Sequence, residues 1–143
     1  MIEGISKHFY RTVLCFALLF TFSGQAQLVV TVSPPKITGQ KAVVPLAMKN
    51  DLAQKVESAR AVVFLLDDHG KMVGQGTRWV IGGSQDKPGL ATGATNSFFF
   101  VIQADKPFTT TNLTVKLNFS RVLLEGGKLA DATKDVQIQN ASK

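Results

Sequence analysis

Few side chains beyond residue 26 of this sequence could take part in chemistry. One histidine remains there, His69, and it lies in the Asp-Asp-His-Gly run at 67–70, whose composition is typical of a turn. A Ser-His-acid triad would have to use this turn residue, and no serine lies near it in the sequence. Asp67 and Asp68 could bind calcium, but calcium needs six or more oxygen ligands and the local sequence offers few others. We therefore expect a solvated turn without a metal.

Other patterns that could indicate chemistry are equally weak. Glu57 and Glu125 could be compared with a glycosidase pair, but a lone small domain rarely has a cleft deep enough to distort a sugar. The glycines within 82–93 and at 126–127 lack the GKS or GKT sequence of a phosphate loop, and no helix follows them. The sequence predicts no catalytic residue, no metal and no cofactor, and hence a protein that is not an enzyme.

The first 26 residues have the three regions of a secretory signal peptide. Lys7 and Arg11 precede an apolar run at 12–22, and small residues follow at Gly24 and Ala26, where a signal peptidase requires them. The apolar run would span about 16 Å as a helix, roughly half of a bilayer core. We expect cleavage after Ala26, which leaves no stable membrane anchor and a periplasmic or secreted protein.

The mature chain is expected to fold without disulfides. Cys15 is the only cysteine, and it lies within the apolar run, preceded by Leu14 and followed by more apolar residues. A lipoprotein cysteine would need a small residue before it and would close that run, so we do not expect lipidation. The core alone must stabilise the domain, which is possible for a chain of this size.

The positive charge of the chain is spread along the sequence. The net charge is +6, and loss of Lys7, Arg11 and Glu3 with the leader leaves fourteen basic and nine acidic residues, a net charge of +5. No run of basic residues forms, and only three of the fourteen are arginines. Nucleic-acid grooves usually show a clustered basic face, so we expect no nucleic-acid partner.

Residues 60–80 form the segment in which two strands and their turn are most clearly predicted. Six apolar residues at 61–66 indicate a buried strand, and a return strand starts at Lys71. A three-residue loop with a bulge at Gly70 would set Gly74 and Gly76 opposite Phe64 and Val62, which is the register that we favour. A two-residue turn at 69–70 would instead set Val73 and Gln75 there.

The same residues resemble a known family. The pattern Phe64-x-Leu66-Asp67-Asp68, the segment 70–77 and the polar turn at 49–51 are similar to the core of bacterial FxLYD domains, and 92–98 resembles the approach to that family's next strand. Asp67 replaces the family's tyrosine, so no role of that tyrosine is carried over. The resemblance implies a small immunoglobulin-like or fibronectin-like sandwich on exported bacterial proteins. It implies no catalytic residues.

The remaining strands complete an all-β domain. Five further strands are predicted, at 28–32, 41–49, 97–103, 113–124 and 128–139. Pro45 should place the second of these at a sheet edge or a bulge, because proline has no N–H to donate. About seven strands without a core helix indicate an antiparallel two-sheet sandwich, immunoglobulin-like, at 27–139, followed by a disordered tail at 140–143. A small open barrel is the alternative.

By elimination, the leading hypothesis is an exported, non-enzymatic module that acts through surface contacts, as an accessory, adaptor or envelope-associated protein. Its partner would be an unknown protein or a second copy. The candidate contact surface is the outward set on two apolar strands: Val63, Leu65, Phe99 and Val101.

The alternative function is a carbohydrate-binding or weakly hydrolytic cell-envelope protein. A sugar site usually offers an aromatic platform, and the mature chain has one tryptophan and no tyrosine. Trp79 would have to form that platform with a phenylalanine, whereas the hairpin pattern favours Trp79 in the core.

Cleavage after Ala26 predicts a mature protein that starts at Gln27. Intact-mass measurement of the exported fraction should give the mass of 27–143. Ala26→Arg should block processing, because the peptidase requires a small residue there, whereas Gln25→Arg changes the neighbouring position and should be processed normally. An exported protein that retains Met1 to Ala26 would refute the prediction.

Overall fold

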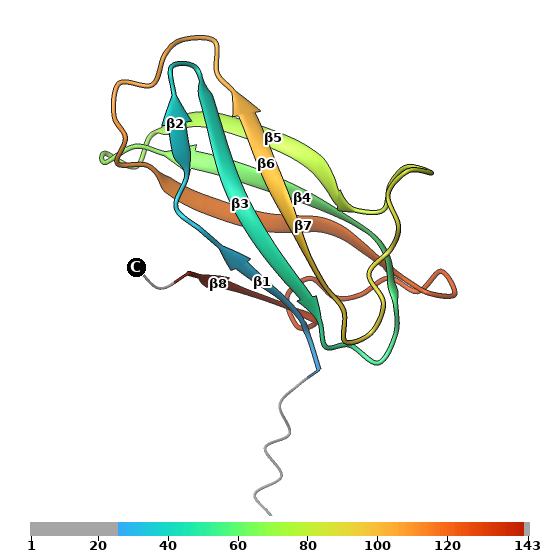
Figure 1. Cartoon of the computed structure of the whole chain (residues 1–143). Helices are drawn as coiled ribbons and strands as arrows, with labels where there is room; N and C mark the ends of the chain where they lie inside the picture. Colours follow the sequence, from blue (N-terminus) through green and yellow to red (C-terminus); the bar gives the residue numbers. More distant parts are fainter. Residues whose placement is uncertain (1–25, 142–143) are drawn as a thin grey trace, which may run out of the picture.

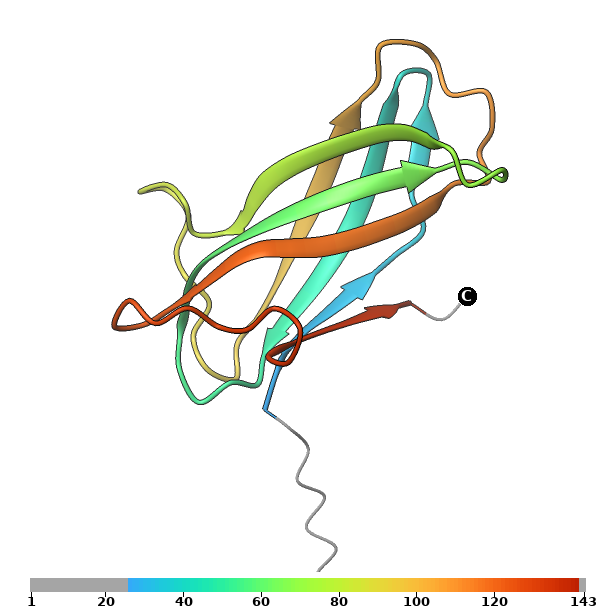
Figure 2. The same cartoon turned by 180° about the vertical axis from the view of Figure 1, so that it is seen from behind.

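The computed structural model describes residues 26–141, and every regular element in that range is a β-strand. The strands form one sheet of five and one of three, packed face to face as a sandwich (Figures 1 and 2). The predicted all-β two-sheet fold is confirmed. Within the same range, no helix is long and apolar enough to span a membrane. The predicted signal peptide lies outside the described residues except for Ala26, as do residues 142 and 143.

Residues 26–141 contain eight strands, whereas about seven were expected. The five-stranded sheet contains β1 (Leu28–Val32), β2 (Lys36–Thr38), β3 (Lys41–Asn50), β6 (Thr95–Gln103) and β8 (Val136–Asn140). The three-stranded sheet has the order β5 (Met72–Ile81), β4 (Val56–Leu66) and β7 (Thr114–Leu124). The additional strand is β2, which forms after Pro34 and Pro35 have ended β1.

The larger sheet is not purely antiparallel, so this part of the prediction is wrong. β3 pairs antiparallel with β6 along one edge and with β1 and β2 in succession along the other. β8 pairs parallel with β1, from Leu28 opposite Val136 to Val32 opposite Asn140. Parallel neighbours cannot be joined by a short turn and need a long connection. β1 and β8 meet this condition because strands β2 to β7 all lie between them in the chain.

Pro45 lies in the middle of the central strand β3, not at an edge or a bulge as its sequence suggested. Its carbonyl accepts the N–H of Ser33, so the side of Pro45 that would carry an N–H faces the break between β1 and β2. Neither β1 nor β2 has a residue paired with Pro45. The missing donor of Pro45 therefore breaks no hydrogen bond of the ladder.

The β4–β5 hairpin has neither of the two predicted registers. Asp67 forms the turn, because its Oδ1 accepts the N–H groups of His69 (2.9 Å) and Lys71 (2.8 Å). Leu66 then faces Met72 and Leu65 faces Gly74, which leaves Val73 as an extra residue in a bulge. Because the bulge adds one residue, the two glycines of β5 face Leu65 and Val63 instead of Phe64 and Val62.

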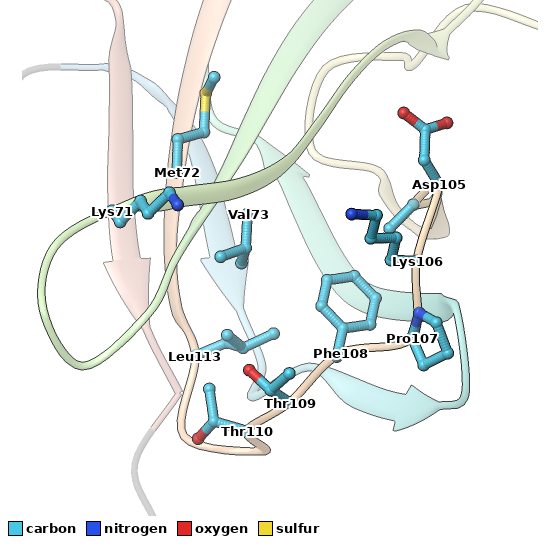
Figure 3. Close-up of a pocket in the computed structure, with 11 residues that line it drawn as sticks. Lys71, Met72, Val73, Asp105, Lys106, Pro107, Phe108, Thr109, Thr110 and Leu113 are labelled. Carbon is cyan, nitrogen blue, oxygen red and sulfur yellow. The ribbon is translucent and has the colours of Figure 1, made fainter.

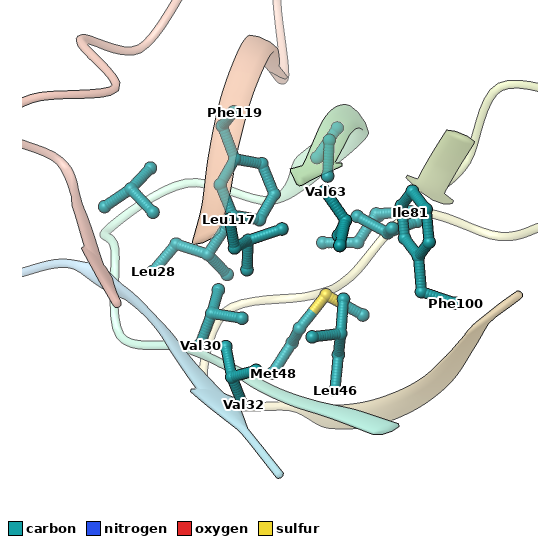
Figure 4. Close-up of a cluster of buried hydrophobic side chains, with 14 of the residues drawn as sticks. Leu28, Val30, Val32, Leu46, Met48, Val63, Ile81, Phe100, Leu117 and Phe119 are labelled. Carbon is teal, nitrogen blue, oxygen red and sulfur yellow. The ribbon is translucent and has the colours of Figure 1, made fainter. Parts of the chain in front are cut away.

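The core lies between the sheets and is built by alternate residues of their strands (Figure 4). Gly74 and Gly76 make room in it for two side chains of β6. A Cβ on Gly76 would lie 3.1 Å from the Phe100 ring, and one on Gly74 would lie 3.3 Å from Ile102. Phe100 is fully buried. The glycines thus accommodate a ring from the facing sheet, whereas the sequence suggested that they accommodate Phe64.

Asn50 ties two loops to the end of β3, and it is the buried polar residue of the core. Its side-chain amide donates to the carbonyls of Gln54 and Leu90, both at 2.9 Å, and its Oδ1 accepts the N–H of Leu52 at 3.0 Å. Leu90 also exchanges two backbone hydrogen bonds with Val56. The segment 82–93 is therefore held against the sandwich at Leu90.

The end of the domain extends beyond the prediction. The sequence placed Asn140 in a disordered tail, but it is the last residue of β8, opposite Val32. The N–H of Ala141 also donates to the carbonyl of Val32 at 2.8 Å. Pairing with β1 orders these residues, and a polar sequence at a chain end gives no sign of such pairing.

Asn50→Ala should lower the free energy of unfolding by about 1–3 kcal/mol, because it removes three side-chain hydrogen bonds and leaves the buried N–H of Leu52 without its acceptor. Urea unfolding measures the change. Asn96→Ala is the matched control: the Asn96 side chain is exposed and accepts only its neighbour's N–H, so the loss should stay within about 0.5 kcal/mol. Equal stability of both variants would show that Asn50 does not fasten the loops.

Candidate functional site

The three-stranded sheet gathers positive charge that is scattered in the sequence. Its strands carry four basic side chains, Arg60, Arg78, Lys116 and Arg121, and one acidic side chain, Glu57. These strands hold all three arginines that follow residue 26. The sequence showed only isolated basic residues, because the strands that bring them together are far apart along the chain.

Two of these arginines lie side by side with the tryptophan on the outer surface of the sheet. Arg60 on the central strand β4 faces Trp79 of β5 on one side and Arg121 of β7 on the other. Ala59, Ala61 and Val122 next to them are buried, so the two arginines point away from the core. We name Trp79, Arg60 and Arg121 the arginine row.

Both neighbouring strands bulge at the arginine row. In β5, Val80 is an extra residue between Trp79, which pairs with Arg60, and Ile81, which pairs with Ala59. In β7, Ser120 is an extra residue between Phe119, which pairs with Ala61, and Arg121, which pairs with Arg60. The Ser120 hydroxyl donates to the Arg60 carbonyl at 3.3 Å. Bulges bend the strand that carries them and redirect side chains, and they are frequent beside functional sites.

The charges of the arginine row are not neutralised by the domain. In residues 26–141 the ion pairs are Lys49 with Asp51 and His69 with Asp68, and neither includes an arginine. Like charges directly opposite each other in an antiparallel pair destabilise it, by roughly 0.2–1 kcal/mol if they mirror the gain of an opposite-charge pair. Placing Arg60 opposite Arg121 thus costs stability, and no carboxylate in the described part of the chain pairs with either arginine.

Trp79 packs against Arg60 and does not offer a free ring. The sequence favoured Trp79 in the core, but it is half-buried on the outer face, with the Arg60 guanidinium carbon 5.9 Å from the ring centroid. Gly83, at φ +84°, lies so close to the indole of Trp79 that an added Cβ would overlap the ring. With Arg60 and Gly83 both packed against it, Trp79 holds Arg60 in place better than it could serve as a sugar platform.

Of the four residues predicted to face outward as a contact surface, two lie in the core and two lie on the outer face. Val63 and Leu65 are fully buried in the core, because they share a face with Ala61 and oppose Gly76 and Gly74. The outward set of β4 is shifted by one residue and includes Val62 and Phe64, which are half-buried.

The other half of that surface is exposed on the five-stranded sheet. The Phe99 side chain is 66% exposed and Val101 is half-buried, both on the outer face. Pro45 lies opposite Phe99 and Val43 lies opposite Val101 in β3. These four residues form an apolar surface that reaches the free edge of the sheet, which we name the β6 patch.

A groove of about 430 Å³ opens where β5 starts and the segment between β6 and β7 passes it (Figure 3). Val73, Phe108 and Leu113 point into its middle, and Lys71 and Lys106 lie on opposite sides. Two further hollows have volumes of about 540 and 440 Å³, one on the outer face of the five-stranded sheet and one beside Pro34 and Pro35. None of these three hollows is lined by a residue of the arginine row or of the β6 patch.

The residues that first suggested chemistry are solvated. The side chain of His69 is 87% exposed at the hairpin tip, and Glu57 and Glu125 are exposed as well. Asp131 has a lowered pKa, chiefly because the Thr133 hydroxyl donates to its carboxylate at 2.6 Å, within one loop. Nowhere in residues 26–141 do three or more His, Cys, Asp or Glu residues gather closely enough to hold a metal ion.

Gly83→Ala should displace Trp79, because the new Cβ would overlap the indole. Gly93→Ala is a matched control: Gly93 has a similar φ of +79°, but a Cβ added there would meet no atom within 4 Å, so both variants share the backbone strain of about 1–2 kcal/mol. The change in tryptophan emission and the additional loss of stability in Gly83→Ala measure the contact of Gly83 with the ring. Identical emission and stability in the two variants would show that Gly83 does not support Trp79.

Comparison with known proteins supports the fold alone. No protein-family model and no curated protein matches the chain. Among solved structures, the chain is similar to the crystal structure of a protein assigned as ApaA from Bordetella pertussis. The two share 17% sequence identity over 73% of this chain and 86% of the other, with a TM-score of 0.51. At this identity the likeness shows a shared β-sandwich and carries no activity or partner from one protein to the other.

Proposed function

We propose that the chain is an exported, non-enzymatic β-sandwich module that acts through surface contacts, and that the β6 patch with the free edge of β6 makes these contacts. The carrying observation is Phe99, a large apolar side chain that is 66% exposed on an edge strand. Export to the periplasm or the exterior rests on the predicted signal peptide. The proposal requires no cofactor, metal or nucleic acid.

β6 offers backbone groups as well as side chains. Among residues 26–141 it pairs with β3 only, so one row of its N–H and C=O groups is free to bind another strand. Its sequence, TNSFFFVIQ, contains no charge and no proline. Natural edge strands are usually protected by lysine, proline or bulges, and an unprotected edge favours strand addition.

The partner that we propose for this edge is a second copy of the chain. The protein carries a net charge of +6, so two copies repel each other over most of their surface, but the uncharged β6 edge can approach its own copy at little electrostatic cost. Antiparallel pairing centred on Phe99 would place Ser97 opposite Val101 and bring the two rings together. The five-stranded sheets would then continue across the dimer.

The carbohydrate alternative has less support. It depended on Trp79 as a platform, and the ring of Trp79 is packed against Arg60 and Gly83. Phe99 is an exposed ring, but its cross-strand partner Pro45 and its neighbour Val101 on the same face are apolar and offer no side-chain hydrogen bond to sugar hydroxyls. The same features suit a protein contact, where an apolar centre is typical.

Phe99→Asp should abolish self-association and leave the fold almost unchanged, since the side chain is largely exposed. We expect a change in unfolding free energy within about 0.5 kcal/mol. Analytical ultracentrifugation over a concentration series measures the dimer. Leu129→Asp is the matched control, because Leu129 is also apolar and 59% exposed but lies outside β6, so this variant should dimerise like the wild type.

Two results would reject the dimer. One is a wild-type protein that remains monomeric at every concentration, and the other is a Phe99→Asp variant that dimerises normally. Loss of the dimer together with a large fall in melting temperature would show that Phe99 supports the fold. In that case Val101→Lys, on the same outer face, tests the contact again.

A further inference from the structure

We propose that the arginine row is a binding site for a phosphate group on a soluble ligand, separate from the β6 patch. Arg60 and Arg121 would bind its oxygens, and Trp79 would hold Arg60 in position. The row lies on the three-stranded sheet and the β6 patch lies on the five-stranded sheet, so the two sites can operate independently.

The unneutralised arginine pair is the first observation behind this proposal. Arg60 and Arg121 face each other across β4 and β7, and within residues 26–141 neither guanidinium takes part in an ion pair. Two facing like charges that no carboxylate neutralises are a local conflict of the kind that is expected at functional sites. A phosphate carries a charge near −2 at neutral pH, which matches the two positive charges.

The second observation is that both positions are arginine and that Trp79 contacts one of them. Guanidinium groups bind phosphate oxygens through paired N–H donors, which lysine cannot do. The mature chain has eleven lysines and three arginines, yet the two positions at the row are both arginine. Contact with Trp79 restricts Arg60, so less side-chain freedom is lost when an anion binds.

The backbone at Arg60 is the third observation. The extra residues Val80 and Ser120 lie in the two strands that flank β4, and both bulges occur next to Arg60. The Ser120 hydroxyl also donates to the Arg60 carbonyl. Bulges change the direction of nearby side chains, so two bulges at one position change the direction of the side chains of the arginine row. Burial of the inner face alone does not require this change.

A soluble ligand suits this surface better than a lipid headgroup. The large apolar side chains that are exposed in residues 26–141 are Met72, Phe99, Leu129 and Ile138, and none of them belongs to the arginine row. A membrane-binding face would normally insert such side chains beside its basic residues. We therefore base the choice of ligand on the match between the two positive arginines and a negatively charged phosphate.

The single tryptophan makes the site directly observable. Because Trp79 contacts Arg60, titration of the protein, expressed from the full chain, with inorganic phosphate at constant ionic strength should give a saturable change in tryptophan emission. Chloride in place of phosphate should give none. Arg121→Gln should weaken the apparent affinity for phosphate about tenfold or more, because it removes charge-assisted hydrogen bonds.

Arg78→Gln is the matched control. Arg78 lies next to Trp79 on the same sheet and carries the same charge, but it faces Ala61 in the pairing and its guanidinium donates to the Thr77 carbonyl. This variant should keep the phosphate affinity within about twofold. Without phosphate, Arg121→Gln should melt at the wild-type temperature or slightly above it, because a repulsion is removed.

Three outcomes would overturn the proposal. The first is the absence of a saturable phosphate response in the wild type, and the second is an equal response of Arg121→Gln and the wild type. The third is co-sedimentation with vesicles of phosphatidylcholine and phosphatidylglycerol without any response to inorganic phosphate, which would indicate a membrane-binding face. A phosphate response that is lost in Arg121→Gln and retained in Arg78→Gln supports the site, whether or not the protein dimerises.

Discussion

The alternation of β4 between core and solvent is the constraint on which the rest of the structure depends. β4 is the central strand of the smaller sheet, so its inward residues, among them Val63 and Leu65, are covered by the facing sheet. A shift by one residue would turn Arg60 into that core, and an unpaired buried charge is far more costly than a lost apolar contact. The same alternation therefore seals the core and presents the arginine row to solvent.

The partners of β4 adapt to this alternation through bulges. The extra residues in β5 and β7 are Val73, Val80 and Ser120. Each shifts the pairing of its strand with β4 by one residue. On the inner face, Gly74 and Gly76 of β5 leave space that Phe100 and Ile102 fill from the other sheet. At one end of the sandwich, Lys87 connects the sheets as well, because it donates to the Trp79 carbonyl and lies 5.0 Å from the Phe98 ring.

The strands of both sheets carry basic side chains, three lysines in the larger sheet, but in the described residues only the smaller sheet sets two of them directly opposite each other. The strands of the smaller sheet carry four basic residues and one acidic residue, and two of its arginines lie directly opposite each other. The larger sheet ends in β6, an uncharged edge with Phe99 exposed. An apolar edge and a basic face favour different ligands, since the first is matched by another apolar strand and the second by an anion. A single small sandwich can thus offer two contact sites.

The sequence by itself determined the strands and much of their alternation, because apolar spacing and turn residues act over a few neighbours. The sandwich, the Asp67 turn and the outward Phe99 were all predicted from such local patterns. Only the tertiary structure decided the hairpin register, the burial of Val63 and Leu65 and the meeting of Arg60 with Arg121. These features depend on bulges and on pairing between strands about 60 residues apart, and local spacing carries no information about either.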